Sequence, residues 1–287
     1  MPESASGRVP FFSLRPALRR HPLALVSLAV LLAIAGLCLA APLLAPYPLD
    51  AIDLGRLRQP PGPGHWMGTD DLGRDVLTRV LYGGRVSILI GLFAAALGTL
   101  LGTLIGAVAG FYGRWVDGLL MRVTDLAYAI PTLPLLIVLS AWTGAAMGSM
   151  ALIIGALSWM ATARVVRAEV LSLRERPFVE AARGLGAGPT RVIARHLLPN
   201  TIGPLVVGAT LGVGNAILIE SSLSFLGLGV QPPVPTWGNM LMDAQAALAS
   251  KPWLTVFPGF AILLVVLAVN FLGEGLQDAL DPQLRTP

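Results

Sequence analysis

Long hydrophobic segments separated by shorter polar ones dominate the chain. Segments long and apolar enough to cross a bilayer occupy residues 22–44, 86–112, 118–142, 146–166, 201–227 and 253–274. A helix of about 20 residues, rising about 1.5 Å per residue, crosses a hydrocarbon core of about 30 Å. Open strands would leave backbone groups without hydrogen bonds in lipid, so each segment is predicted to be a helix. The pattern therefore predicts an all-α integral membrane protein with six transmembrane helices.

The composition favours the same class. Of 287 residues, 55% are hydrophobic and only 13% are charged, whereas soluble domains carry about 25% charged residues. The net charge is +4, but the arginines lie between apolar segments and form no basic run interleaved with aromatic residues. A lipid bilayer is therefore the expected partner, and nucleic acid is not. The first apolar segment is longer than the 7–15 residues of a signal peptide, which predicts a first span.

The arginines also predict the orientation. Most of the 20 Lys and Arg residues fall on one side if the amino terminus is cytoplasmic, and the positive-inside rule then places both termini in the cytoplasm. The resulting division is a cytoplasmic tail at 1–21, a first helix with an extracytoplasmic segment at 22–85, a five-helix core at 86–275 and a cytoplasmic tail at 276–287. The loop at 167–200 is predicted to be cytoplasmic.

Two local patterns refine this division. Thr69 or Asp70 could cap a short helix that begins near Val76. In the second span, small residues recur every four positions and predict a close contact with another helix. These small residues are Ala94, Gly98, Gly102, Gly106 and Gly110.

The 167–200 loop is predicted to form two short helices joined by a tight turn. Pro177 suits the first turn of one helix, and the segment 186–189 (Gly-Ala-Gly-Pro) interrupts it. The small side chains of Ala181 and Ala182 would allow this hairpin to dock closely on another protein. A hairpin that only lies on the membrane surface is the alternative.

The spacing within this loop resembles the "EAA" loop of ABC importer permeases. Glu180, Ala181 and Ala182 are followed by Gly186, His196 and Pro199 at the family's intervals. His196 replaces the usual isoleucine, as in the dipeptide, oligopeptide and nickel branch. The segments 65–85 and 224–238 also resemble this branch, and the resemblance covers roughly residues 15–283.

The resemblance implies a type I permease fold in a bacterial inner membrane, with 167–200 as a coupling-helix loop. The implied partners are a second homologous permease, two ATP-binding subunits that hold ATP and magnesium, and an extracytoplasmic substrate-binding protein. Peptides are the expected substrate, with nickel or related small solutes as alternatives, carried by alternating access. The implied coupling residues are Glu180, Ala181, Ala182, Arg183, Gly186, His196 and Pro199.

Polar residues within the predicted spans are candidates for the translocation path or a gate: Asp125, Asn215, Glu220, Ser221 and Ser224. Asp125 is expected either to pair with Arg122 or to act in gating, and Glu220 either to line the path or to bond another helix. Pro131 and Pro134 are expected to kink the third span.

Catalysis has little support in the sequence. The sole lysine, Lys251, is followed by Pro252, so no P-loop is present. The three histidines are scattered, and neither a metal site, a cofactor nor a catalytic residue is expected in this chain. A membrane scaffold without transport and an intramembrane enzyme are the alternatives to a permease.

Overall fold

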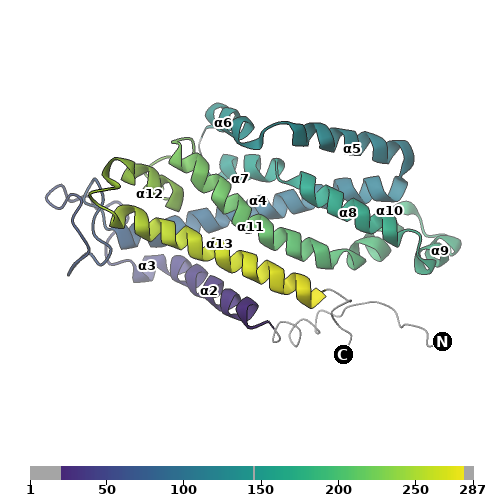
Figure 1. Cartoon of the computed structure of the whole chain (residues 1–287), viewed down its shortest axis with the longest axis horizontal. Helices are drawn as coiled ribbons and strands as arrows, with labels where there is room; N and C mark the ends of the chain where they lie inside the picture. Colours follow the sequence, from purple (N-terminus) through teal and green to yellow (C-terminus); the bar gives the residue numbers. More distant parts are fainter. Residues whose placement is uncertain (1–20, 145, 281–287) are drawn as a thin grey trace.

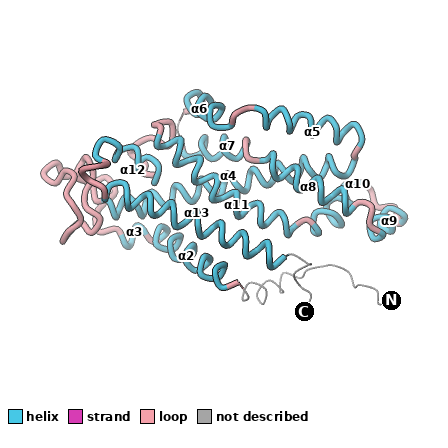
Figure 2. The backbone as a smooth tube through the Cα atoms, in the orientation of Figure 1, coloured by secondary structure: helices cyan, strands magenta, loops and turns pink. Residues whose placement is uncertain are grey.

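The computed structural model describes residues 21–144 and 146–280 as an elongated bundle of helices (Figure 1). The α-helices are α2 (Pro22–Leu39), α3 (Ala41–Leu44), α4 (Val76–Tyr112), α5 (Arg114–Ala129), α6 (Thr132–Thr143), α7 (Met147–Ala156), α8 (Trp159–Leu173), α9 (Pro177–Gly184), α10 (Pro189–Val192), α11 (Ile202–Phe225), α12 (Trp237–Ala244) and α13 (Trp253–Leu280). Figure 2 shows that helices form the body and that the longest loops gather at one end. Residues 1–20 and 281–287, which make up most of the two predicted tails, lie outside the described residues.

The all-α membrane fold predicted from the sequence is confirmed. Five helical segments are long and apolar enough to span a membrane: Pro22–Leu39, Val76–Tyr112, Met147–Leu173, Ile202–Phe225 and Trp253–Leu280. Helices α5 and α6 would make a sixth span, but they are bent by 83°. The third predicted span is therefore broken at Pro131 rather than merely kinked. Pro134 lies in the first turn of α6, where a missing N–H is tolerated.

Helix α4 lies at the centre, and its small residues pack against α8. A methyl group built on Gly98 would meet Ser158, and one on Gly106 would meet the backbone of Ala163. Only the absence of side chains lets the two backbones approach so closely, and this approach maximises van der Waals contact. The predicted helix contact is confirmed, and the structure identifies its partner.

The start of α4 differs from the prediction. The Asp75 carboxylate accepts a hydrogen bond from the N–H of Thr78 at 2.8 Å, so Asp75 caps the helix. The prediction that Thr69 or Asp70 caps the helix is therefore wrong. The expected short helix is present, but it forms the first turns of α4. Helix α4 thus runs without interruption from the loop at 45–75 through the bundle.

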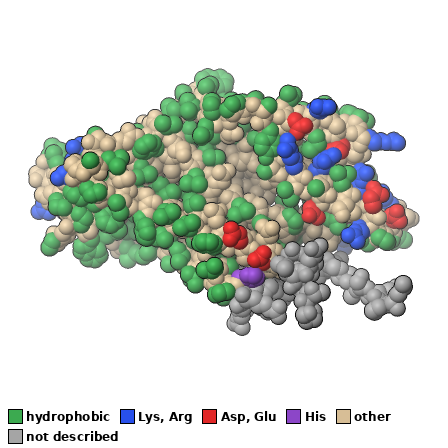
Figure 3. All heavy atoms as spheres, in the orientation of Figure 1, with side chains coloured by type: hydrophobic (Ala, Val, Ile, Leu, Met, Phe, Trp, Pro, Cys, Tyr) green, Lys and Arg blue, Asp and Glu red, His purple; other side chains and the backbone are tan. Residues whose placement is uncertain are grey.

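The two ends of the bundle are built differently. The 45–75 loop and α12 lie at one end, and α9 and α10 lie at the other (Figure 1). In the view of Figure 3, charged side chains gather towards the α9 end, whereas hydrophobic side chains cover much of the rest.

Candidate functional site

The segment between α8 and α11 folds as a hairpin that projects from the bundle (Figure 1). Gly186 ends α9 with a backbone φ of +80°. Its N–H donates to the Arg183 carbonyl at 2.9 Å, and the N–H of Ala187 donates to the Ala182 carbonyl at 3.0 Å. This pair of bonds is a Schellman motif, which favours glycine at the left-handed position. The predicted turn at Gly186 is therefore present.

The hairpin has one buried face. Val179 and Val192 are 0% exposed and pack with Val166 and Leu197 into a hydrophobic cluster beneath α9 and α10. Ala182 is also buried against its own chain, because it lies one turn after Val179. The coupling role expected for Ala182 stays a prediction. The cluster fixes the hairpin to the end of α8.

The opposite face of the hairpin is uncovered. Glu180 and Ala181 are exposed, and Leu185 is 90% exposed. Arg183 lies over the ring of Phe111, 5.3 Å from its centroid, and no ion pair with Glu180 occurs within residues 21–280 as described. The Glu180 carboxylate therefore stays available to a partner protein.

The two remaining candidates of the loop lie where it returns to the bundle. His196 is partly buried in a π-helical turn at Ile193–Leu197. Pro199 is exposed in the following 3-10 turn, which leads into α11. Short π-helical and 3-10 turns therefore lead from the hairpin to α11, with Thr201 as the one non-helical residue between the 3-10 turn and α11.

Glu220 forms a buried polar cluster at the other end of α11. Its side chain is 0% exposed. Ser224 donates to one carboxyl oxygen at 2.7 Å, and Ser87 of α4 donates to the other at 3.3 Å. The Ser87 hydroxyl in turn accepts the N–H of Trp237 at 3.2 Å. In this chain Glu220 therefore links α4, α11 and α12, which is one of the two roles expected for it.

The other candidates on α11 do not all join this cluster. Ser221 is buried, and its hydroxyl has no hydrogen-bond partner in the part of the chain that the structure describes. Asn215 is exposed on α11. The candidate residues of the translocation path on α11 therefore do not all lie together. Glu220 and Ser224 belong to the buried cluster, whereas Asn215 is exposed.

Asp125 pairs with a residue that sequence reasoning missed. Arg164 of α8 donates to its carboxylate at 2.7 Å, so the expected pair with Arg122 is wrong. The ring of Tyr128 lies under the Arg164 guanidinium, 4.4 Å from its carbon. A second ion pair joins Asp117 of α5 to Arg167 of α8. Spacing along one helix could not reveal either pair, because each depends on how α5 crosses α8.

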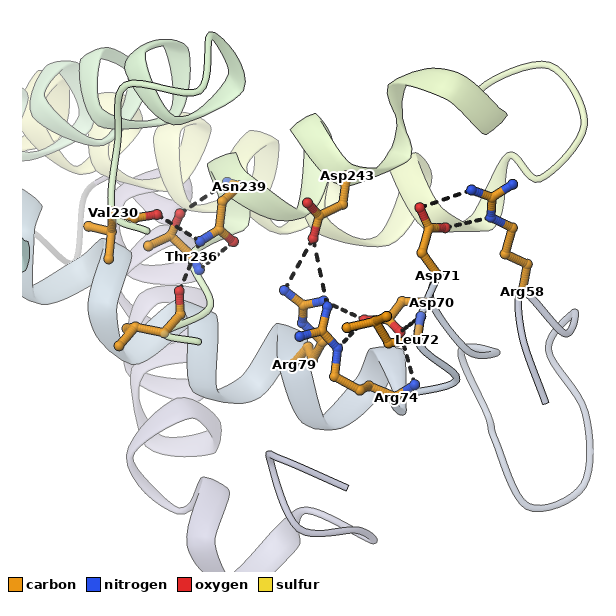
Figure 4. A network of polar contacts seen from close by, with 11 residues as sticks. Arg58, Asp70, Asp71, Leu72, Arg74, Arg79, Val230, Thr236, Asn239 and Asp243 are labelled. Carbon is orange, nitrogen blue, oxygen red and sulfur yellow. Dashed lines mark hydrogen bonds and ion pairs between the residues drawn. The ribbon is translucent and has the colours of Figure 1, made fainter. Parts of the chain in front are cut away.

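An ionic network ties the loop before α4 to α12 (Figure 4). One oxygen of Asp70 accepts the N–H groups of Leu72 and Arg74, both at 2.9 Å. The other accepts Arg74 Nε at 2.7 Å and also bonds Arg79. Arg79 reaches Asp243 of α12 at 3.4 Å. Burial alone would raise the pKa of Asp70, but Arg79 and the N–H groups of Arg74 and Leu72 together hold that pKa below its usual range.

The network is complete within this chain. Burial raises the pKa of Asp243, and the charges of Arg79 and Arg74 only partly offset this effect. Beside the network, Thr236 caps α12 by accepting the N–H of Asn239 at 3.1 Å (Figure 4). Within residues 21–144 and 146–280, no cluster of three His, Cys, Asp or Glu side chains could hold a metal ion.

Comparison with known protein families identifies the family of this chain. Residues 102–286 match the family described as the binding-protein-dependent transport system inner membrane component. The chain belongs to this family. Residues 15–61 match the N-terminal transmembrane domain of oligopeptide transport permease C. The predicted resemblance is confirmed, and the chain is a multi-pass permease component of the inner membrane rather than an enzyme.

Individual permeases of the family are similar over nearly the whole chain. The dipeptide transport system permease protein DppC of Alkalihalophilus pseudofirmus is 42% identical, covering 94% of this chain and 88% of its own. The glutathione transport system permease protein GsiD of Pectobacterium atrosepticum is 40% identical, covering 95% and 90%. The oligopeptide transport system permease protein OppC of Mycobacterium bovis is 39% identical, covering 93% and 92%.

Proposed function

We propose that this permease forms, with a second homologous permease subunit, the translocation path of an ATP-driven importer of peptides. The observation that carries the proposal is the hairpin of α9 and α10. Its inner face is fixed to the bundle by Val179 and Val192, while its outer face exposes Glu180, Ala181 and Leu185. A rigid element with one uncovered face is suited to receive motion from another protein.

In this proposal the energy comes from two ATP-binding subunits that hold ATP and magnesium. The hairpin docks on one of them and lies in the cytoplasm with both chain termini, as the arginine distribution favours. When ATP binding moves the docked surface, the hairpin moves α8 and α11 together, because it continues into both. The bundle then alternates between inward- and outward-open states.

Peptides are the proposed cargo, delivered by an extracytoplasmic binding protein. Similar proteins carry the names of dipeptide, oligopeptide and glutathione permeases, and glutathione is itself a small peptide. Nickel is the alternative cargo. A scaffold without transport is separated from these proposals by uptake: a reconstituted complex that assembles but imports no solute would support the scaffold.

Site-directed crosslinking tests the coupling role. In the assembled complex, with the buried Cys38 replaced by serine, a cysteine at Ala181 is expected to crosslink to an ATP-binding subunit. The matched control is a cysteine at Leu54, which is 68% exposed in the loops at the opposite end and is expected to give no such product. A crosslink from Leu54 and none from Ala181 would reverse the proposed orientation.

A further inference from the structure

The 45–75 loop forms a cavity at the end of the bundle opposite the hairpin (Figure 1). Its volume is about 320 Å³, within the range of about 300–1,000 Å³ that small-molecule sites occupy. Side chains of both charges line it, together with an imidazole and a phenol ring. Among the lining residues are Tyr47, Asp53, Arg56, His65, Gly73 and Asp75.

The walls of this cavity are held in place within the loop itself. The N–H of Asp53 donates to the Leu72 carbonyl at 3.2 Å, so the first half of the loop lies on the second half. Gly73 has a φ of +74°, and a methyl group built on it would collide with the Asp53 carbonyl. The Tyr47 hydroxyl donates to the Gly64 carbonyl at 2.8 Å. The cavity is therefore a fixed feature of the folded loop.

One ring nitrogen of His65 has no partner in this cavity. His65 is 8% exposed, and its Nδ1 lies 2.9 Å from the Asp75 carboxylate. That carboxylate also accepts the N–H and the hydroxyl of Thr78. An ionised carboxylate can only accept, so Nδ1 carries the ring proton and Nε2 is the acceptor. Nε2 has no hydrogen-bond partner in the described ranges 21–144 and 146–280, and it is suited to receive a donor from a ligand.

We propose that this cavity binds a small zwitterionic peptide. This inference rests on the proposed function and adds a substrate site in the 45–75 loop. The peptide ammonium group donates to His65 Nε2 and to the Asp53 carboxylate. The Tyr47 ring stacks on His65 with the ring centroids 4.6 Å apart and holds the imidazole in place. The Arg56 guanidinium has five N–H donors and receives the peptide carboxylate.

The charges that would bind the peptide are paired with each other when the cavity holds no peptide. Arg56 Nε lies 3.4 Å from the Asp53 carboxylate, and both side chains are 53% exposed. Such a pair contributes little to stability, so a peptide that supplies both opposite charges can replace it. The other oxygen of Asp53 accepts the N–H of Gly55 at 3.0 Å, which keeps the carboxylate in position without Arg56.

Protection of His65 from chemical modification tests the site. Diethyl pyrocarbonate modifies an unprotonated imidazole nitrogen, and mass spectrometry measures the modification of each histidine in the assembled complex in nanodiscs, without the binding protein. The probes are alanyl-alanine, its N-acetyl form and its C-terminal amide. Alanyl-alanine is expected to protect His65 and to leave the modification of His21, which lies outside the cavity, unchanged.

Two variants separate the two ends of the peptide. Asp53→Asn removes the charge and keeps an oxygen for the Gly55 N–H. It is expected to raise the concentration for half protection about tenfold for the free peptide and the amide, and to leave the acetylated peptide unchanged. Arg56→Gln is expected to do the same for the free and acetylated peptides and to leave the amide unchanged. The matched control Asp50→Asn, in the same loop but outside the cavity, is expected to change none of the three.

Three results would overturn the proposal. These are no protection of His65 by any probe at millimolar concentration, equal losses for all three probes in both variants, and protection by Ni²⁺ but by none of the peptides. The proposed function is scored separately, by uptake of alanyl-alanine in the presence of the binding protein. Import without protection retains the function and rejects this site, whereas protection without import retains the site and contradicts the function.

Discussion

The two ends of the molecule differ in the burial and pairing of their side chains. At the end formed by the 45–75 loop and α12, the Arg79 side chain is 5% exposed and bonds Asp70 and Asp243 of its own chain. At the hairpin end, Leu185 is 90% exposed and Glu180 has no ion-pair partner within the described ranges 21–144 and 146–280. The ionic network at the first end is complete within one chain, whereas the hairpin at the second end has an uncovered face that another protein can cover.

Desolvation explains this difference. A charge taken out of water needs partners in fixed geometry, and breaking such a pair leaves an uncompensated charge. The network around Arg79 therefore holds the loop before α4 and α12 in one arrangement. The hairpin needs no such network, because a valine-rich cluster fixes it from beneath. The comparison predicts that mutations affect stability at the first end and coupling at the second.

The largest expected effect is on stability at the end formed by the 45–75 loop and α12. Arg79→Gln leaves Arg74 as the one remaining cation for both Asp70 and Asp243, at 2.7 Å and 3.9 Å, and is expected to destabilise the protein by about 3 kcal/mol. Thermal unfolding of the purified protein in detergent measures this loss. The control is Arg58→Gln, because the Arg58–Asp71 pair is 41% and 33% exposed and contributes below about 1 kcal/mol. Equal losses for the two variants would remove the distinction between buried and exposed pairs.

An intermediate effect is expected in the hairpin. Gly186→Val places a β-branched residue at a φ of +80°, with a local strain of about 1–3 kcal/mol. The docking face is then displaced, and ATPase stimulation by the loaded binding protein is expected to fall at least about fivefold. Gly188→Val is the matched control, because Gly188 has an extended backbone and open space around it. Unchanged ATPase activity and uptake in Gly186→Val would argue against the coupling role.

The smallest expected effect is the response of the network to mild acid. A lowered folded-state pKa means that the stability contributed by Asp70 is present above its unfolded pKa, about 3.9, and is lost only as pH falls through the lower folded value. Asp243 has a raised folded-state pKa, so its protonation causes no loss of stability on acidification. The stability difference between wild type and Asp70→Asn should therefore change by less than about 0.5 kcal/mol between pH 7 and 5. Unfolding midpoints across this range measure it, and a difference that already shrinks at pH 5 would contradict the assignment.

Much of the architecture was predictable from local sequence. Hydrophobic length located five of the spanning segments, the Gly98–Gly110 spacing indicated a close helix contact, and Gly186 indicated the turn of the hairpin. These features depend on residues near one another in the chain, whose preferences hold without knowledge of the rest of the fold. The prolines after Ile130 indicated a distortion, but the bend of 83° depends on what packs around it.

Pairings between distant residues were decided only by the tertiary structure. Asp125 meets Arg164 across 39 positions, and Arg79 meets Asp243 across 164. Helical periodicity identifies neighbours three or four residues apart, which is why Arg122 was wrongly chosen as the partner of Asp125. The amino-acid sequence by itself determined that this protein is a bundle of membrane helices with a turn at Gly186. The crossing of those helices decided which charges meet, because only that crossing sets the distances between side chains on different helices.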